Sequence, residues 1–183
     1  MNKGKIVAVV GMCGSGKSVV TEVFTDAGWK SVYFGGVTME ELERRGLPKN
    51  EANERAVREE LRAKHGLAAY AVLLADRIEQ FASEGNVVLD GLYSWSEYKY
   101  LQDKFGDRLH ILAIVTDRSV RYSRLGTRTI RPLTPAEATA RDYSEIENLE
   151  KGGPISIADR FITNNGTAEE LVKAVKDYMN EIQ

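Results

Sequence analysis

The chain has 183 residues, of which 43% are apolar and 28% are charged, and its net charge is −2. This composition is that of an ordinary globular protein, and the length predicts one domain spanning residues 1–183 with enough apolar residues for a core. The slight negative charge argues against stable nucleic-acid binding, because non-specific binding of that kind depends on an excess of positive charge.

Strands and helices are predicted to alternate along the chain. A continuous β-branched run at residues 6–10 predicts a strand that is buried on both faces of a parallel sheet. The other strands are predicted at residues 31–34, 87–91, 109–115 and 161–163. Helices are predicted at residues 17–27, 38–45, 50–65, 94–105 and 167–182. Two more are predicted with one end defined: one ends at residue 84 and one begins at residue 134. This order indicates right-handed βαβ units and an α/β fold built on a parallel sheet.

The short apolar run at residues 6–10 also indicates in which cellular compartment the protein is expected. Five apolar residues are too few for the core of a signal peptide, and no run of eighteen apolar residues follows. The single cysteine, Cys13, excludes an internal disulfide framework and is typical of a reducing compartment. We therefore expect a cytoplasmic protein with no membrane partner.

Residues 11–18 read Gly-Met-Cys-Gly-Ser-Gly-Lys-Ser and match the pattern G-x-x-x-x-G-K-[ST] in full. In this pattern the backbone N–H groups point at phosphate oxygens, the lysine reaches the β- and γ-phosphates, and the serine ligates Mg²⁺. The alternative is a chance glycine-rich turn, which a chain of this length contains in about one case in a hundred. We expect the Lys17 side chain to be exposed in the empty loop. The predicted nucleotide-binding residues are Gly11, Met12, Cys13, Gly14, Ser15, Gly16, Lys17, Ser18 and Val19.

Asp90 ends the apolar run at residues 87–89 and matches the Walker B pattern, in which a carboxylate at a strand end holds Mg²⁺. The alternative is an ordinary aspartate in a turn. Ser18 and Asp90 are therefore the predicted metal ligands, with Mg²⁺ as the cofactor and ATP, or a similar nucleoside triphosphate, as the phosphoryl donor.

With both elements present, the chain resembles the nucleoside monophosphate kinase group of P-loop proteins, and within it adenylate-kinase-like prokaryotic proteins and dephospho-coenzyme A kinases. Residues 88–91 are similar to the Asp-Gly at the Walker B strand of adenylate kinases. Residues 157–166 resemble the Ala-Asp-x-x-Ile-x-Asn-x-Gly segment near the end of dephospho-coenzyme A kinases. The resemblance implies a three-layer α/β/α P-loop NTPase fold with a five-stranded parallel sheet. It also implies a core at residues 1–36, 85–123 and 157–183, acceptor-binding helices at 37–84 and a short lid at 124–156.

A group of arginines follows the predicted fourth strand. Spacings of three and four place Arg121, Arg124 and Arg128 on one face if the predicted helix continues. Phosphoryl transfer requires positive charge on the migrating group, and similar kinases carry an Arg-x-x-x-Arg pair at the lid that Arg124 and Arg128 match. Arg141 and Asp142 could return from the far side of the lid. The alternative is a solvated basic face.

The acceptor side departs from the family pattern. Relatives in the prokaryotic set carry Gly-Asp and then an arginine after the second strand, where this chain has Gly35, Gly36 and Met39. Adenylate kinases have an arginine shortly after the Walker B Asp-Gly, where this chain has Tyr93. Arginines in the intervening helices could compensate: Arg44, Arg45, Arg58 and Arg62.

These observations predict a kinase whose small-molecule acceptor is a nucleotide, a nucleoside or a coenzyme A-type metabolite. The expected catalytic residues are Lys17, Asp90, Arg124 and Arg128. The alternative is a nucleotide-binding regulatory NTPase with a degenerate acceptor site. The sequence has no Asn-Lys-x-Asp motif and no Ser-Gly-Gly-Gln signature, which disfavours a GTPase and an ABC-type ATPase.

Overall fold

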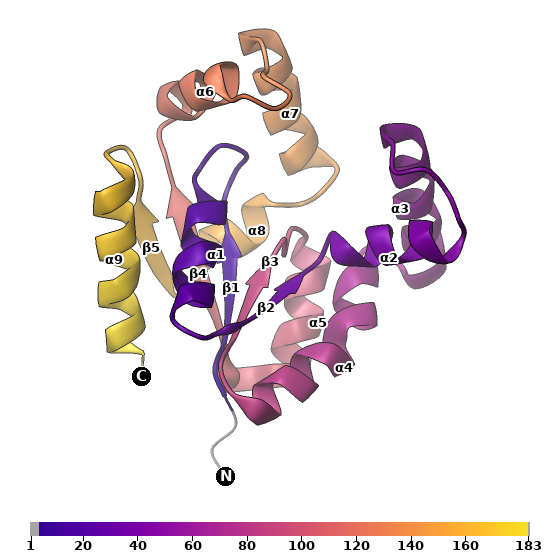
Figure 1. Ribbon diagram of the computed structural model, residues 1–183, viewed down its shortest axis with the longest axis horizontal. Coiled ribbons are helices and arrows are strands. Elements are labelled where there is room, and N and C mark those ends of the chain that lie inside the picture. Colours follow the sequence, from indigo (N-terminus) through magenta and orange to yellow (C-terminus); the bar gives the residue numbers. More distant parts are fainter. Residues whose placement is uncertain (1–3, 183) are drawn as a thin grey trace.

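The computed structural model describes residues 4–182, which form a five-stranded parallel sheet flanked by helices (Figure 1). The order across the sheet is β2-β3-β1-β4-β5. The strands are β1 (Ile6–Val10), β2 (Lys30–Tyr33), β3 (Val87–Asp90), β4 (Leu109–Val115) and β5 (Arg160–Thr163). The five-stranded parallel sheet that the sequence predicts is confirmed.

The central strand β1 explains how the two faces of the sheet are covered. All five of its residues are buried, and they alternate between two apolar clusters. Ile6, Ala8 and Val10 pack in the cluster with α4 and α5, whereas Val7 and Val9 pack in the cluster with α1 and α9. The helices of the two faces are α1 (Lys17–Asp26), α9 (Ala168–Glu181), α4 (Ala69–Glu84) and α5 (Trp95–Phe105). This is the predicted three-layer α/β/α arrangement.

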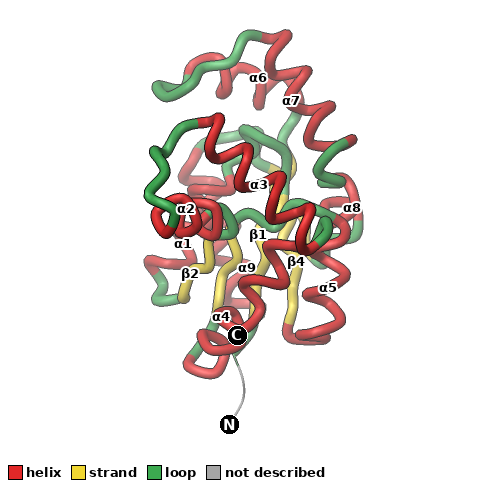
Figure 2. Tube along the Cα trace, turned by 90° about the vertical axis from the view of Figure 1, so that its right-hand side faces the viewer, coloured by secondary structure: helices red, strands yellow, loops and turns green. Residues whose placement is uncertain are grey.

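Two further groups of helices extend from the edge of the sheet where its strands end. One follows β2 and consists of α2 (Gly36–Arg44) and α3 (Glu51–His65). The other follows β4 and consists of α6 (Arg118–Thr127) and α7 (Pro135–Glu147). Figure 2, turned by 90° from Figure 1, shows α6 and α7 above the strands. The two groups therefore lie on either side of the loop that joins β1 to α1.

Helix starts follow the sequence signals closely. Capping boxes open α5, α7 and α9, each with a serine or threonine N-cap and a glutamate three residues later. The pairs are Ser94 with Glu97, Thr134 with Glu137, and Thr167 with Glu170. Within residues 4–182, no helix is long and apolar enough to cross a membrane.

The structure differs from the sequence prediction at three places. A short helix, α8 (Gly152–Ser156), precedes β5, and the 3₁₀ turn η1 (Gly106–Arg108) precedes β4. More importantly, α6 ends at Thr127, and Arg128 has an extended backbone with ψ of 145°. The carbonyl of Leu125 accepts a hydrogen bond from the Leu133 amide at 3.0 Å, which shows that the chain folds back here. Arg128 therefore does not share a helical face with Arg121 and Arg124, as a continuing helix would require.

Candidate active site

The loop between β1 and α1 has the backbone that the phosphate-loop pattern predicts. Gly14 and Gly16 have φ of 81° and 99°, in the left-handed region that favours glycine. A Cβ at Gly16 would lie 2.4 Å from Asn164 Nδ2, so a side chain there would collide with the neighbouring loop. Among the described residues, no side chain caps α1. The first amides of this helix are therefore directed at the space inside the loop, where an anion is favoured.

Residues after β4 and β5 hold the loop in place. Asn164 is buried and donates through Nδ2 to the Ser15 carbonyl at 2.8 Å, and Thr116 Oγ1 donates to the same carbonyl at 3.2 Å. Asn164 belongs to the segment whose likeness to dephospho-coenzyme A kinases the sequence indicated. Asp159, in the same segment, accepts from the Ile111 amide at 2.7 Å and so ties the start of β5 to β4. The structure thus gives this segment a role in supporting the phosphate loop.

Lys17 does not extend into solvent, so the expectation of an exposed side chain is wrong. Its Nζ donates to the carbonyls of Gly11 and Met12 at 2.8 and 3.0 Å. A buried ammonium group requires acceptors, and these two carbonyls of the loop are within its reach. Burial lowers the pKa of Lys17 to about 8, and the positive charge of Lys151 acts in the same direction.

Asp90 lies at the end of β3, beside the start of the phosphate loop. Its Cα is in register with Val9 of β1 on one side and with Tyr33 of β2 on the other. Burial raises the pKa of Asp90, while the positive charge of Lys17 opposes that shift. The strand register therefore brings the predicted Walker B carboxylate and the predicted phosphate-binding lysine together.

The residues present fit a Mg²⁺ ion held jointly with phosphates. Mg²⁺ prefers oxygen ligands, keeps several waters, and is usually held by one or two protein oxygens together with substrate phosphates. Ser18, exposed in the first turn of α1, and the half-buried Asp90 supply such oxygens. Across residues 4–182 there is no cluster of three or more His, Cys, Asp or Glu side chains, so a closed site made of protein ligands alone is not formed.

The arginines of α6 divide into different roles. Arg121 is buried and forms a bidentate ion pair with Asp142 of α7, at 2.8 and 2.7 Å. It also donates to the Cys13 carbonyl at 3.1 Å. It therefore joins α6, α7 and the phosphate loop. Arg124 donates to the Gly166 carbonyl at 3.3 Å, and its other terminal nitrogen, Nη1, has no partner in the part of the chain that the structure describes.

Arg128 lies apart from that group. It is exposed and its Nε donates to the Arg131 carbonyl, within the turn that follows α6. The structure does not bring the Arg124 and Arg128 pair together on the phosphate loop. The role that the sequence predicts for them, on the migrating phosphoryl group, therefore requires these side chains to move.

One cluster at the loop was not found from the sequence. Glu145 of α7 is only 1% exposed and accepts from the Cys13 amide at 3.0 Å, Arg141 Nε at 3.0 Å and Lys151 Nζ at 2.8 Å. Lys151 in turn lies over the Tyr93 ring, 4.2 Å from its centroid. In the sequence, Glu145 and Lys151 have the ordinary pattern of charges on a solvated helix. The Arg141–Glu145 spacing of four residues was the only local signal.

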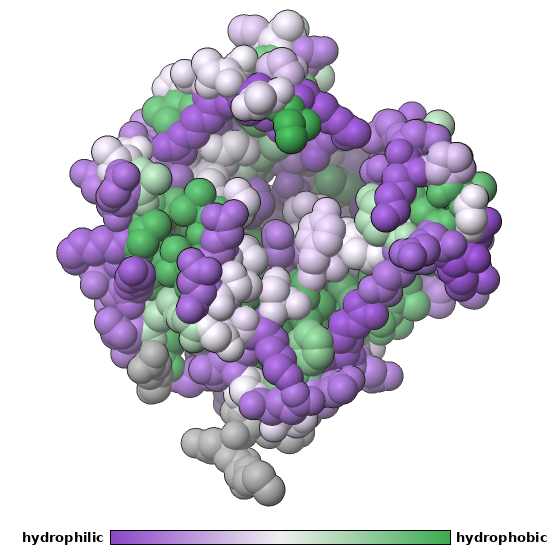
Figure 3. All heavy atoms as spheres, viewed as in Figure 1, coloured by the Kyte–Doolittle hydropathy of each residue, from purple (hydrophilic) through white to green (hydrophobic). Residues whose placement is uncertain are grey.

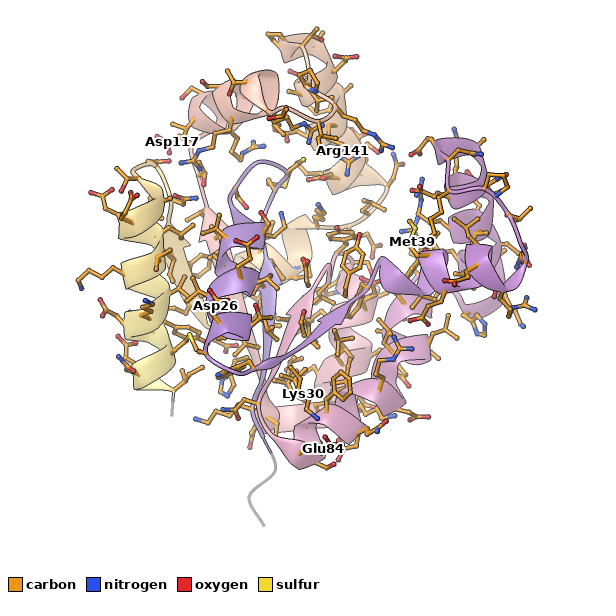
Figure 4. All side chains as sticks on the ribbon, viewed as in Figure 1. Asp26, Lys30, Met39, Glu84, Asp117 and Arg141 are labelled. Atoms are coloured by element: carbon orange, nitrogen blue, oxygen red, sulfur yellow. The ribbon has the colours of Figure 1, made fainter. Side chains whose placement is uncertain are left out.

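The opposite side of the site is formed by β2, α2 and α3. Figure 3 shows a hollow between the α6–α7 group and α3, and Figure 4 shows Arg141 and Met39 on opposite sides of it. Tyr33, at the end of β2, is 53% exposed. Burial of part of its ring and the charge of Asp90 raise the pKa of Tyr33, and the positive charge of Arg58 opposes them. Arg58 of α3 therefore acts on the same region as Asp90.

The four arginines considered as compensating groups fall into two sets. Arg62 lies over the Tyr70 ring at 5.8 Å and, like Arg58, belongs to the side of α3 that faces Tyr33 and Tyr70. Arg58 also pairs with Glu51 and Glu54 of its own helix, at 2.8 and 3.4 Å. Arg44 and Arg45 form ion pairs with Glu41 and, for Arg45, with Glu60. They line a separate pocket of about 520 Å³ between α2, α3 and α4.

Comparison with known proteins agrees with this geometry. A family model described as an AAA domain matches residues 7–149. The chain is 34% identical over 181 residues to a UPF0200 protein of Thermococcus gammatolerans, covering 97% of this chain and 95% of the relative. The crystal structure of TT1252 from Thermus thermophilus superposes with a TM-score of 0.66 at 20% identity and covers 99% of both chains. Dephospho-CoA kinase from Campylobacter jejuni superposes with a TM-score of 0.59 at 16% identity and covers 98% of both chains.

The sheet order, the phosphate loop and the superposed structures show that the chain has the fold of P-loop kinases. The resemblance to P-loop kinases that the sequence indicates is thereby confirmed. The chain belongs to the AAA-domain family that the model describes and to the UPF0200 family of its relatives.

Proposed function

We propose that this protein is a Mg²⁺-dependent kinase that transfers the γ-phosphoryl group of ATP to a small-molecule acceptor. The acceptor is a nucleotide, a nucleoside or a coenzyme A-type metabolite. The observation that carries the proposal is the phosphate loop itself, which opens onto the uncapped start of α1 with Asp90 at the end of the adjacent strand.

The proposed chemistry assigns a role to each group on the donor side. The acceptor oxygen forms a bond to the γ-phosphorus, and the bond from that phosphorus to the β–γ bridging oxygen breaks to release ADP. Where the acceptor group is a hydroxyl, its proton is released to solvent. Lys17 neutralises charge on the β- and γ-phosphates, and amides of the loop bind their oxygens. Ser18 and Asp90 would hold Mg²⁺, which supplies further positive charge at the phosphates when bound. Arg124 and Arg128 are proposed to reach the migrating group from the lid, residues 124–156.

The proposed acceptor site is the hollow between the lid and the helices at residues 37–84. Arg58, which also pairs with Glu51 and Glu54, and Arg62 are the cations of α3 on this side, whereas Arg44 and Arg45 line the separate pocket. Tyr33 and Tyr93 add aromatic surface at the strand ends. The dephospho-CoA kinase of Campylobacter jejuni, which has the same fold, bears the name of a kinase for a small metabolite, and this supports an acceptor of that size.

The test is turnover of labelled ATP in the presence of Mg²⁺ with a panel of nucleotides, nucleosides and dephospho-coenzyme A. A kinase transfers label to one member of the panel, and that acceptor increases the rate of ATP consumption. A regulatory NTPase transfers label only to water, and a macromolecular partner rather than a metabolite increases its rate. Lys17→Ala is the control that must remove the activity in either case.

A further inference from the structure

The buried cluster around Glu145 contains a cation whose donors are only partly used. An ammonium group carries three N–H donors. Lys151 Nζ makes one ion pair with Glu145 at 2.8 Å, and the Tyr93 ring covers a second side at 4.2 Å. Lys151 is only 4% exposed, and no further hydrogen bond of this ammonium is present in the described part of the chain. One N–H is therefore left for a ligand.

Lys151 is located beside the lysine of the phosphate loop. After burial itself, the positive charge of Lys151 is the largest cause of the lowered pKa of Lys17. Tyr93, over which Lys151 lies, follows Asp90 by three residues. Because Glu145 bonds both the Cys13 amide and Lys151 Nζ, Lys151 lies next to the phosphate loop, on the side of the end of β3, where the γ-phosphate of a nucleotide held by Lys17 is expected to approach.

The surrounding residues hold Lys151 in this place. Its amide donates to the Glu145 carbonyl at 3.1 Å, so the chain turns back directly after α7. Two residues later, Gly153 packs so closely on Trp95 of α5 that an added Cβ would lie 2.7 Å from the indole ring. Because the Glu145 carboxylate also accepts from the Cys13 amide, the ammonium group is fixed relative to the phosphate loop.

The charges at this point leave a surplus that suits an anion. Apart from the Arg121–Asp142 pair, whose charges balance each other, the described cations that act on this part of the loop are Lys17, Lys151 and Arg141, against the two carboxylates of Glu145 and Asp90. Two lysines in proximity repel one another, and a phosphate oxygen between them would relieve that repulsion. Glu145 compensates only part of the positive charge.

We propose that Lys151 is a second cation of the donor site that binds the γ-phosphate, and that Glu145 is the positioning residue that holds it there. The inference rests on the proposed function, because it requires a nucleoside triphosphate in the loop. It adds a residue from the segment after α7 to the groups that recognise the phosphates. It also predicts that Lys151 distinguishes ATP from ADP, because ADP has no γ-phosphate.

The first experiment measures equilibrium binding of Mg²⁺-ATP and Mg²⁺-ADP to the full chain by calorimetry. Lys151→Ala is expected to weaken ATP binding about tenfold or more, the typical effect of losing a hydrogen bond between charged groups, while ADP binding changes less than about twofold. Lys151→Arg is expected to restore most of the preference for ATP. Lys173→Ala removes an exposed lysine that pairs with Asp177 on α9 and is the matched control with no effect.

The outcomes separate this inference from the proposed function. If Lys151→Ala weakens ATP and ADP equally, or weakens neither, Lys151 does not contact the γ-phosphate and the inference is overturned. If Lys17→Ala abolishes binding of both nucleotides in that same series, the donor site that the proposed function requires is present even where the inference about Lys151 fails. If the unaltered protein binds neither nucleotide, both the proposed function and the inference are wrong.

The second experiment tests Glu145 through the pH dependence of the ATP preference. Glu145→Gln keeps an acceptor for the Cys13 amide but removes the negative charge that raises the pKa of Lys151. The other groups that face Lys151 are Arg141, Cys13, Tyr93 and Lys17. Lys151 then loses its proton at a lower pH, so the ATP-to-ADP affinity ratio should decline at a lower pH than in the unaltered protein, in a titration from about pH 6 to pH 9. An unchanged midpoint would overturn the positioning role. If Glu145→Gln does not fold, Glu145→Asp, which shortens the side chain, must weaken ATP binding without weakening ADP binding.

Discussion

Removing one partner of the buried ion pair between Arg121 and Asp142 should strongly destabilise the α6–α7 group. Both side chains are buried, and Asp142→Ala removes the two Nη–Oδ bonds of 2.8 and 2.7 Å together with the bond from the Tyr122 hydroxyl at 3.2 Å. Arg121 would then keep a single bond, to the Cys13 carbonyl at 3.1 Å. Breaking a buried pair from one side costs about 3–5 kcal/mol. Because that carbonyl remains as an acceptor, we expect a loss near the lower end, about 3 kcal/mol.

Urea unfolding followed by circular dichroism measures this loss. Asp177→Ala, which breaks the exposed Lys173–Asp177 pair on α9, is the matched control, and we expect it to cost less than about 1 kcal/mol. The double variant Arg121→Met with Asp142→Ala should recover part of the lost stability, because it no longer leaves a buried charge without its partner. If Asp142→Ala costs no more than the control, the pair does not hold α7 to the phosphate loop, and the reasoning is refuted.

Four further predictions concern the activity. Lys17→Ala should abolish phosphoryl transfer while the protein remains folded, and near-normal turnover in a folded variant would exclude the proposed donor site. Asp90→Asn should raise the Mg²⁺ concentration needed for half-maximal activity, and an unchanged Mg²⁺ titration would count against its role as a metal ligand. Alanine at Arg124 or Arg128 should lower kcat on the order of a thousandfold or more with little change in Tm; a lower Tm with unchanged specific activity would show that the pair is structural. Ordinary nucleoside monophosphates should be poor acceptors, because the acceptor side lacks the arginines of similar kinases; a kcat/KM above about 10⁴ M⁻¹s⁻¹ for any of them would contradict this.

The sequence by itself determined the features that depend on neighbouring residues. The buried run of β1 predicts a central strand because a strand covered on both faces needs apolar side chains at every position. The glycines and the lysine of residues 11–18 predict the phosphate loop because the loop is made almost entirely by its own backbone. The capping boxes place the starts of α5, α7 and α9 because the N-cap and its glutamate partner are three residues apart.

The tertiary structure decided which charged side chains meet at the loop. Glu145 and Cys13 are 132 residues apart, and Arg121 and Cys13 are 108 apart, so no local pattern indicates that they are in contact. The fold also determined that Arg121 forms an ion pair with Asp142 and that Arg128 lies outside α6. It likewise determined that the Lys17 ammonium group donates to a carbonyl of its own loop. The spacing of apolar residues along the sequence indicates which face of a helix is apolar, but a buried ion pair depends on how two helices are oriented toward each other. That orientation is set by the packing of the whole chain, and for this reason the cations around the phosphate loop other than Lys17 could be assigned only from the three-dimensional structure.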